Sequence, residues 1–411
     1  MTRVAVVGAG PAGLMAAERL AEAGIAVTVY DRMASPARKF LLAGRGGLNL
    51  THSETLDDFL SRYRPADGPV RTAIEHFPPQ RLRAWCEALG QPTFVGTSGR
   101  VFPQAMKASP LLRAWLRRLR DAGVTFAPRH RFVGWREGAL LFERPDGSTV
   151  SDRPDATVLA LGGASWPRLG SDGTWITALA DRGVTIAPLR PANCGVRVAW
   201  SAPFRSRRAG DPLKRIAAAF AGRTVRGEAV ITAEGLEGGA IYALSADLRE
   251  AVASDGHAVL AIDLRPDLAH ADLARHIARR RPKESFSTAL RKNAKLAPAA
   301  IDLVQEAAMN QARRPGDLAA AELAALIKAV PVRVAGVAGI ERAISTAGGV
   351  SLHDIGSNFM LRTCAGVFVA GEMLDWEAPT GGYLLQASFA TGRAAADGAA
   401  AWLAEKDSAS G

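Results

Sequence analysis

The first residues with an evident chemical use form a glycine turn between an apolar strand and a helix. The strand is Val4 to Val7, and the turn that follows it is Gly8-Ala9-Gly10-Pro11-Ala12-Gly13. Gly8 permits the sharp turn, Gly10 lets the backbone approach a pyrophosphate, and Gly13 lets the helix pack on the strand. The helix over 11–23 directs its N-terminal amides and its positive dipole end at the phosphates.

A second strand and an acidic residue complete this pattern. Val27 to Tyr30 read as a strand, and Asp31 ends it eighteen residues after Gly13. A carboxylate at that position accepts hydrogen bonds from ribose hydroxyls and disfavours a 2′-phosphate. The sequence therefore predicts a dinucleotide site. Because no second G-x-G-x-x-G turn is present, NADH or NADPH would have to dock transiently rather than occupy a domain of its own.

A second cluster of candidate residues lies near the end of the chain. Gly371-Glu372 follow the apolar strand over 365–370, at the edge of a parallel sheet where ligands bind. Thr380-Gly381-Gly382-Tyr383 then begin a helix whose dipole can stabilise negative charge on a reduced flavin, and Gln386 lies one turn further on. An ordinary helix cap by Thr380 is the alternative. Together with the first turn, this arrangement indicates FAD.

Side chains that can hold or move protons are few around the expected flavin. They are Arg45, His52, Tyr383 and Glu372. His52 can donate a proton to a reduced double bond, although a plain surface histidine is the competing interpretation. We expect Glu372 to hold the cofactor or a loop. No His, Cys, Asp or Glu pattern has metal-ligand spacing, so we predict no metal.

The elements that must position these residues fall into three segments. Residues 1–190 alternate strands and helices, which favours an α/β sheet. Residues 191–337 differ: 191–265 contain short strands with glycine turns, and 266–337 are mostly helical. The α/β pattern resumes over 338–411. We interpret this as a discontinuous Rossmann-type domain that is interrupted by an insert with a β part and an α part.

Composition restricts the class of protein further. The chain has 411 residues, of which 48% are hydrophobic, and it contains no apolar run long enough to span a membrane. We expect a cytoplasmic protein whose three cysteines are small buried side chains. The net charge is +11, and the insert carries 22 Lys and Arg against 15 Asp and Glu. Such a surface attracts RNA, but it also arises from solvated helix faces.

The motifs resemble one known family. Four motifs are similar to those of the bacterial BaiN/aminoacetone-oxidase-like flavoproteins. They are the glycine turn, Lys39-Phe-Leu-Leu-Ala-Gly-Arg-Gly-Gly-Leu-Asn-Leu-Thr51, Gly348-Gly349-Val350 and the segment from Gly371 to Gln386. Three further motifs occur in the same order along the chain as in that family, so the resemblance covers most of the chain. They are Arg100-Val-Phe-Pro103, Ala160-Leu-Gly-Gly163 and Gly170-Ser-Asp-Gly173. It implies a glutathione-reductase-like FAD domain and an insert with a β-barrel-like part and a helical part.

The resemblance also implies which residues contact FAD. Gly8, Gly10 and Gly13 would bind the pyrophosphate, and Asp31 the adenosine ribose. The full set of expected cofactor-binding residues is Gly8, Ala9, Gly10, Pro11, Ala12, Gly13, Asp31, Arg32, Lys39, Ala43, Gly44, Gly46, Asn49, Ala160, Leu161, Gly162, Gly371, Glu372, Gly381, Gly382, Tyr383 and Gln386. The expected catalytic residues are Arg45, His52 and Tyr383. Relatives carry Arg-Cys where this chain has Gly47-Leu48, and Arg45 can restore the cation two residues earlier.

Three functions fit these observations. The leading hypothesis is an FAD-dependent oxidoreductase that passes hydride through flavin N5 from NADH or NADPH to a conjugated double bond, with a uracil ring of ribosomal RNA as one substrate. The second is a small-molecule reductase or amine oxidase without an RNA substrate. The third is a flavin-containing RNA-binding or assembly factor without turnover. The sequence does not distinguish the substrates or the oligomeric state.

Overall fold

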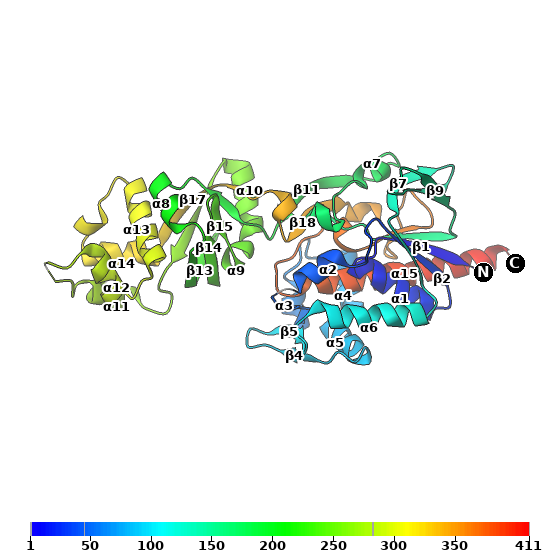
Figure 1. Cartoon of the computed structure of the whole chain (residues 1–411), viewed down its shortest axis with the longest axis horizontal. Helices are drawn as coiled ribbons and strands as arrows, with labels where there is room; N and C mark the ends of the chain where they lie inside the picture. The colour runs from blue at the N-terminus through cyan, green and yellow to red at the C-terminus, as the bar shows by residue number, and fades with distance from the viewer. Residues whose placement is uncertain (1, 45, 282, 411) are drawn as a thin grey trace. The chain divides into compact units, whose positions relative to one another are not determined.

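The computed structural model describes residues 2–44, 46–281 and 283–410, and it divides the chain into two compact units. Unit 1 comprises Met1–Arg190 and Ser345–Gly411, and unit 2 comprises Pro191–Ile344 (Figure 1). The second boundary therefore lies seven residues beyond the expected 337. The reason is that Ile344 still hydrogen-bonds through its amide to the Asn193 carbonyl, at 3.3 Å, within unit 2.

Unit 1 is built on a five-stranded parallel sheet. Its order is β19 (Val367–Val369), β10 (Ala156–Leu159), β1 (Arg3–Val7), β2 (Ala26–Asp31) and β6 (Thr125–Pro128). In register, Val4 lies between Ala156 and Val27. Val4 to Val7 are all buried, as expected of a central strand covered on both faces. The predicted α/β, Rossmann-type fold is confirmed, and β19 brings the C-terminal segment next to the N-terminal one.

Helices cover this sheet, and two of them pack on each other along much of their length. α1 (Pro11–Glu22) contacts the long α15 (Tyr383–Ser410), as Figure 1 shows. A Cβ on Gly392 would lie 2.2 Å from the Ala12 carbonyl oxygen, so the absence of a side chain there permits the close approach. The other helices of unit 1 are α2 (Arg38–Ala43), α3 (Leu56–Leu60), α4 (Pro69–His76), α5 (Pro79–Ala88), α6 (Ala108–Asp121) and α7 (Ile176–Ala180).

A buried carboxylate ties three of these helices together. Glu18 of α1 is 4% exposed. Its Oε2 accepts hydrogen bonds from the indole nitrogens of Trp85 on α5, at 3.0 Å, and Trp115 on α6, at 2.6 Å. Its Oε1 accepts from Arg118, at 3.0 Å. Each carboxylate oxygen is thus satisfied, which a buried charge requires.

Three smaller sheets complete unit 1. One has the order β3 (Thr51–His52), β5 (Arg100–Pro103) and β4 (Thr93–Val95), and it supports the glycine-rich segment after α2. A second consists of β7 (Arg131–Arg136), β8 (Ala139–Glu143) and β9 (Thr149–Asp152). The third pairs β11 (Ile186–Ala192) with β18 (Ser345–Val350), the strands by which the chain leaves and re-enters unit 1.

Unit 2 contains a closed barrel and a helical part. The barrel order is β12 (Val196–Val198), β15 (Gly235–Glu237), β14 (Arg223–Ile231), β13 (Pro212–Phe220), β16 (Ala258–Asp263) and β17 (Val330–Val337). The helices are α8 (Ala202–Arg208), α9 (Gly239–Tyr242), α10 (Ser245–Asp255), α11 (His270–Ile277), α12 (Phe286–Asn293), α13 (Pro298–Asn310) and α14 (Ala320–Lys328).

One part of the expected insert needs correction. Residues 330–337 were assigned to the helical part, but they form β17, which closes the barrel by pairing with β12 and β16. Buried residues alternate with more exposed ones along β17, the period of a strand. Among the described residues, no helix is long and apolar enough to cross a membrane, and no group of three or more His, Cys, Asp or Glu is arranged to hold a metal. All three cysteines are buried.

Candidate functional site

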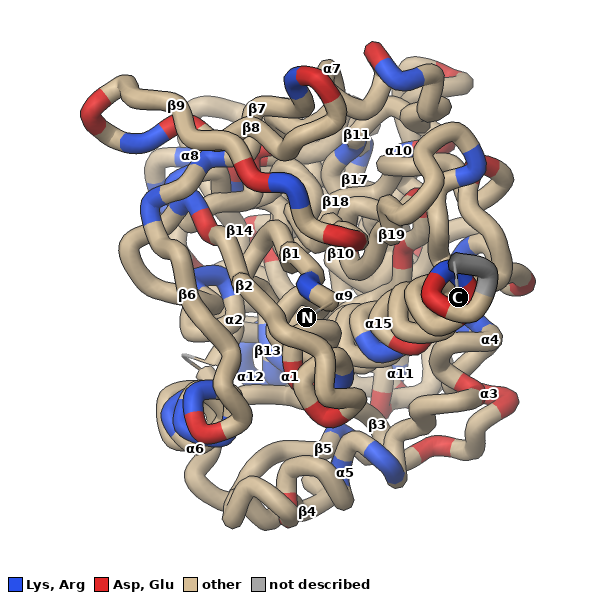
Figure 2. The backbone as a smooth tube through the Cα atoms, turned by 90° about the vertical axis from the view of Figure 1, so that its right-hand side faces the viewer, with Lys and Arg blue, Asp and Glu red and all other residues tan. Residues whose placement is uncertain are grey.

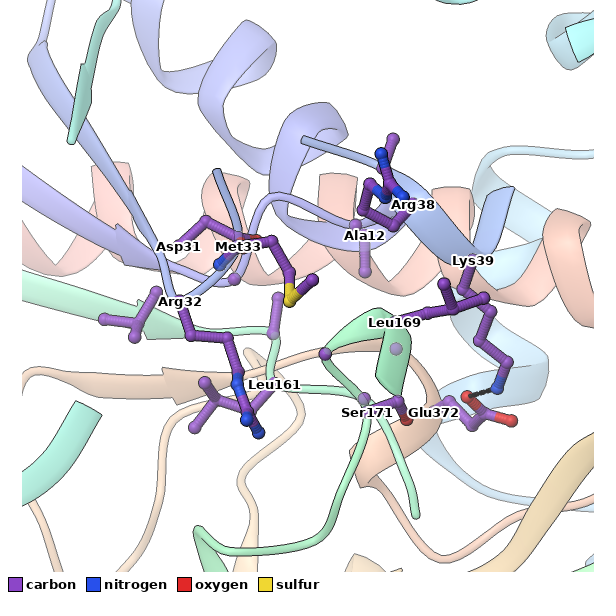
Figure 3. Close-up of a pocket in the computed structure, with 18 of the residues that line it drawn as sticks. Ala12, Asp31, Arg32, Met33, Arg38, Lys39, Leu161, Leu169, Ser171 and Glu372 are labelled. Carbon is purple, nitrogen blue, oxygen red and sulfur yellow. Dashed lines mark hydrogen bonds and ion pairs between the residues drawn. The ribbon is translucent and has the colours of Figure 1, made fainter. Parts of the chain in front are cut away.

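A cavity in unit 1 opens at the carboxyl ends of the central strands, where open α/β sheets bind ligands. About 970 Å³ of space within it and at its open mouth is free of protein atoms. Figure 3 shows how residues from the glycine turn, the end of β2, the start of α2 and the segment after β10 surround it. Twelve of the expected cofactor-binding residues line it: Gly8, Gly10, Pro11, Ala12, Asp31, Arg32, Lys39, Ala160, Leu161, Gly162, Gly371 and Glu372.

The glycines of the first turn are required for two different reasons: contact with protein backbone and space for a ligand. A Cβ on Gly8 would lie 2.2 Å from the Ala160 carbonyl oxygen, and one on Gly13 would lie 1.8 Å from the Gly8 carbonyl oxygen. Both positions are therefore closed by protein. A Cβ on Gly10 would meet no protein atom within 4 Å, and it would stand in the cavity at the N-terminus of α1. Gly10 leaves room for a ligand, as a pyrophosphate site requires.

Asp31 holds the turn as well as lining the cavity. Its Oδ2 accepts from the Ala9 amide and its Oδ1 from the Met33 amide, both at 2.7 Å. Burial raises the pKa of Asp31 above its ordinary value, while these two amides act in the opposite direction. Each carboxylate oxygen of Asp31 can accept one further hydrogen bond, so both remain able to bind a ribose hydroxyl. Ribose binding by Asp31 stays a prediction. Ala9 and Gly13 shape the turn rather than line the cavity.

Several cavity residues were not among those expected. Met33, Leu169, Ser171, Asp172 and Trp175 contribute to the wall. Arg32 and Asp172 form an ion pair across it. The Gly170-Ser-Asp-Gly173 motif was a signal for the loop, but sequence spacing carries no information that Asp172 meets a residue 140 positions earlier.

An ion pair occupies the other end of the cavity. The Lys39 ammonium donates to Glu372 Oε2 and to the Ser165 hydroxyl, each at 2.6 Å. Glu372 Oε1 accepts from the Thr346 amide at 3.0 Å. Glu372 therefore has a cation and an amide as partners, and it joins α2 to the segments around β10, β18 and β19. This arrangement fits the expected role of Glu372 in holding the site rather than transferring protons.

Most of the residues expected around the flavin ring do not line the described cavity, and several of them pack against other parts of the protein. Gly44 packs on Ala108 and Gly382 on the backbone of Thr51, where a Cβ would come within 2.6 Å and 2.5 Å of them. Gln386 is fully buried and donates to the Phe77 carbonyl at 2.6 Å, so it points into the core. Expected flavin-side residues that do not line the described cavity are Ala43, Gly44, Gly46, Asn49, Gly381, Gly382, Tyr383 and Gln386.

Buried polar atoms mark the same region. Asn49 Oδ1, Thr51 Oγ1 and Gln386 Oε1 are inaccessible and have no hydrogen-bond partner among the described residues. Native proteins leave few such atoms, so each of them invites a partner from outside the chain or from water. Arg45 lies outside the described residues.

Two of the expected acid–base residues, His52 and Tyr383, form a cluster around Glu54. The Tyr383 hydroxyl donates to Glu54 Oε1 at 2.5 Å, and Arg62 donates to Oε2 at 2.8 Å. Burial raises the pKa of Tyr383 above its ordinary value, and the bond to Glu54 adds to this. The His52 ring stacks on that of Tyr383, with centroids 5.8 Å apart.

Both ring nitrogens of His52 contact backbone. Nδ1 accepts from the Glu54 amide at 3.2 Å, and Nε2 lies 3.0 Å from the Ser98 carbonyl oxygen. This pattern fits a neutral ring that carries its proton on Nε2. In this conformation His52 and Tyr383 hold their protons against protein acceptors and do not direct them into the cavity.

Taken together, the cavity fits a flavin dinucleotide. The open space at Gly10, the carboxylate of Asp31, the cation of Lys39 and the unpartnered polar atoms beyond it are the features that such a cofactor needs. Fold and site define a nucleotide-binding flavoprotein of the Rossmann type. Residues 2–398 match the family described as HI0933-like protein Rossmann domain, and the chain belongs to that family. It is an FAD-dependent oxidoreductase.

Individual relatives extend over the whole chain. The 3-dehydro-bile acid delta(4,6)-reductase of Clostridium scindens is 26% identical over 414 residues, covering 97% of this chain and 99% of the relative. Among solved structures, 3-ketosteroid delta1-dehydrogenase from Sterolibacterium denitrificans matches 98% of this chain and 100% of its own, with a TM-score of 0.52 and 13% identity. The 3-ketosteroid-delta4-(5alpha)-dehydrogenase of Rhodococcus jostii RHA1 has a TM-score of 0.48, 17% identity and coverages of 98% and 97%.

When bound, FAD supplies hydride transfer. The chain supplies the rest of the site. Backbone at Gly8 to Ala12 would receive the phosphates of FAD, while Asp31 fixes the turn and the Lys39–Glu372 pair fixes the opposite wall.

Proposed function

We propose that the chain reduces a carbon–carbon double bond conjugated to a carbonyl group in a small, largely apolar molecule, with NADH or NADPH as the hydride donor. The relative that spans nearly the full length of both chains carries this proposal, because its name describes such a reduction. Bound FAD would supply the hydride to the electron-poor carbon, and a proton from water or from an acidic side chain would complete the product.

An exposed apolar face beside the glycine-rich segment supports an apolar substrate. Phe94 on β4 lies opposite Phe102 on β5, with ring centroids 5.9 Å apart. Phe94 is 38% exposed and Met106 is 39% exposed. A Cβ on Gly47 would lie 2.8 Å from the Met106 methyl carbon and 3.6 Å from the Phe102 ring. Together these residues present apolar surface next to the segment that is expected to border the flavin.

The Tyr383–Glu54 pair is the candidate proton source in this proposal. The Tyr383 hydroxyl donates a 2.5 Å hydrogen bond to Glu54, so Tyr383 can donate its proton to substrate only if that bond opens. Arg62, paired with Glu54 at 2.8 Å, would then keep Glu54 ionised. In this proposal His52 orients Tyr383 by stacking and does not transfer the proton itself.

The test is anaerobic reduction of the FAD-loaded protein by NADH and by NADPH, followed by addition of a cyclic enone. The expected result is bleaching of the flavin by one nucleotide and recovery of its colour on addition of the enone. Bleaching by amines without a nicotinamide would instead identify an amine oxidase. Flavin that neither nucleotide bleaches would favour a factor without turnover. Either result would overturn the proposal.

Basic surface on unit 1 supports RNA as a second candidate substrate. Arg113 and Arg117 lie one turn apart on α6, both exposed, and neither has an ion-pair partner within the described parts of the chain. Figure 2 shows Lys and Arg positions gathered on α6. In the insert, Arg208 and Lys292 are paired with Asp302 and Glu284, whereas the exposed Arg205 and Arg291 have no ion-pair partner within the described residues. Unpaired arginines bind phosphates in a salt-dependent way.

The RNA proposal has its own measurement. We expect the protein to bind ribosomal RNA at moderate salt, and we expect Arg113→Gln/Arg117→Gln to weaken that binding without changing enone reduction. Equal RNA binding by the variant, or binding no stronger than that of an acidic control protein, would remove this candidate.

A further inference from the structure

The segment from Gly162 to Trp175 follows β10 and forms one wall of the cofactor cavity. Leu169, Gly170, Ser171, Asp172 and Trp175 all contribute to that wall. The Trp175 indole nitrogen donates to the Gly162 carbonyl at 2.9 Å, which closes the segment on itself. We call residues 162–175 the strap. Figure 3 shows Leu169 and Ser171 of the strap between Arg32 and Met33 on one side and Lys39 and Glu372 on the other.

The strap meets the turn after β2 at two points. Gly170 has a φ of +103°, and a Cβ there would lie 3.0 Å from Met33 Cγ. Asp172 Oδ2 is paired with the Arg32 guanidinium, and their side chains are 18% and 33% exposed. Met33 is itself fixed, because its amide donates to Asp31 Oδ1. The ion pair therefore joins the strap to the same turn that shapes the pyrophosphate end of the site.

The two oxygens of Asp172 have separate tasks. Oδ1 accepts from the Thr174 amide at 3.2 Å and from the Thr174 hydroxyl at 2.9 Å, which shapes the strap locally. Oδ2 takes Arg32. Ser171, next to it, is 6% exposed, and its hydroxyl has no hydrogen-bond partner within the described residues. A buried hydroxyl without a protein partner leaves that wall open to a hydrogen bond from a ligand or from water.

We propose that the Arg32–Asp172 ion pair is a clasp that holds the strap over the nucleotide half of FAD and sets how fast the cofactor leaves. Arg32 and Asp172 act through the strap, so they are positioning residues and not hydride-transfer residues. In this proposal FAD leaves between the turn after β2 and the strap, so the pair opens for its passage. The inference concerns cofactor retention and is independent of the substrate.

Asp172→Asn tests the clasp selectively. Asparagine keeps the Oδ1 acceptor for Thr174 and removes the charge that binds Arg32. From the FAD-loaded protein, released flavin is collected through a membrane filter at timed intervals. We expect release to be roughly threefold to tenfold faster than from the unaltered protein, because a partly buried ion pair is lost. The matched control is Arg226→Gln, which breaks the exposed Arg226–Asp267 pair in unit 2 and should leave the release rate unchanged.

A double-variant comparison separates the clasp from direct contacts between Arg32 and FAD. If the pair acts as a unit, Arg32→Gln/Asp172→Asn releases FAD no faster than the quicker single variant. Multiplied effects, or release from Asp172→Asn at the unaltered rate, would overturn the proposal. Asp172→Glu keeps the charge and should retain slow release. If Asp172→Asn fails to fold, as judged by circular dichroism of the apoprotein, Arg32→Gln against Arg32→Lys provides the same comparison, and equal release rates there would also overturn it.

Discussion

Lys39 and Glu372 form a 2.6 Å ion pair across the end of the cofactor cavity, although 333 residues separate them in the sequence. Lys39 belongs to α2, near the start of the chain, and Glu372 follows β19, near its end. Their side chains are 26% and 17% exposed, so the pair is partly shielded from water. The two segments of unit 1 are thus joined at the place where the cofactor should sit.

Replacing Lys39 by methionine should therefore weaken the apoprotein as well as FAD binding. Glu372 would retain the Thr346 amide but lose its cation. We expect the free energy of unfolding to fall by about 2 kcal/mol. Urea denaturation of the apoprotein measures this. The double variant Lys39→Met/Glu372→Gln should lose less free energy of unfolding than the sum of the losses in the two single variants. Simple additivity of these losses would show that the pair does not stabilise the fold.

Alanine at Gly10 and at Gly13 should have different consequences. A Cβ on Gly10 meets only the cavity, whereas one on Gly13 would lie 1.8 Å from the Gly8 carbonyl oxygen. Gly10→Ala should leave the melting temperature of the apoprotein unchanged and lower FAD affinity at least tenfold, by our estimate of roughly 1.4 kcal/mol or more from displaced phosphate contacts. Gly13→Ala should lower both. Normal FAD affinity in Gly10→Ala would place the phosphates elsewhere.

Substitution of Glu18, which lies outside the cavity, should lower the free energy of unfolding strongly. In Glu18→Gln, one of the two acceptor oxygens becomes a donor, which leaves either the indoles of Trp85 and Trp115 or the Arg118 guanidinium facing an amide group. We expect a loss of about 2–4 kcal/mol in the free energy of unfolding. The control is Arg19→Gln, which breaks the more exposed pair with Asp397 and should cost less than about 1 kcal/mol. Similar losses in both would contradict this interpretation.

The Glu54 cluster predicts a pH dependence of stability. Burial acts to raise the pKa of Glu54, but the hydrogen bonds from Arg62 and Tyr383 outweigh it, so this pKa lies below its ordinary value of 4.5. A lowered pKa in the folded state gives stability that is present above pH 4.5 and is lost as the pH falls through the folded-state pKa. The difference in unfolding free energy between the unaltered protein and Glu54→Gln should therefore be constant from pH 7 to about pH 5 and shrink below about pH 4.5.

The matched control for that titration is Glu75→Gln. Glu75 pairs with Arg71 on the exposed face of α4, at 3.0 Å, and its side chain is 40% exposed. Its effect should be small at every pH. A Glu54→Gln difference that grows in acid would mean that the carboxylate is not stabilised by its neighbours.

Local spacing predicted the parts of the site that depend on neighbouring residues. β1, the turn from Gly8 to Gly13, α1 and β2 follow one another within thirty residues, and the pattern of glycines and apolar residues determines them. The position of Gln386 was harder to predict. It lies one turn into α15 as expected, but the helix is rotated so that its amide meets the Phe77 carbonyl. That rotation depends on packing against other helices, which no local spacing encodes.

Long-range partners were the other unpredictable part. Arg32 and Asp172 are each ordinary polar residues in their own segments, and only the fold brings them together. β17 was missed because it follows directly on Ala-rich helical sequence, and its alternating pattern becomes decisive only when β12 and β16 provide the barrel to complete. Tertiary context overrode the local composition there.

The discontinuity of unit 1 also affects the biosynthesis of the holoprotein. Gly8 leaves the ribosome early, but Gly371 and Glu372, which complete the cavity, are made only after the whole of unit 2. At about 5–20 residues per second, the last wall of the site is added roughly 20 to 70 seconds after the first. Until β19 is made, β10 lacks its outer neighbour in the sheet, so a nascent chain has an exposed sheet edge and an incomplete FAD site. The complete FAD site therefore exists only once the segment after unit 2 has been made.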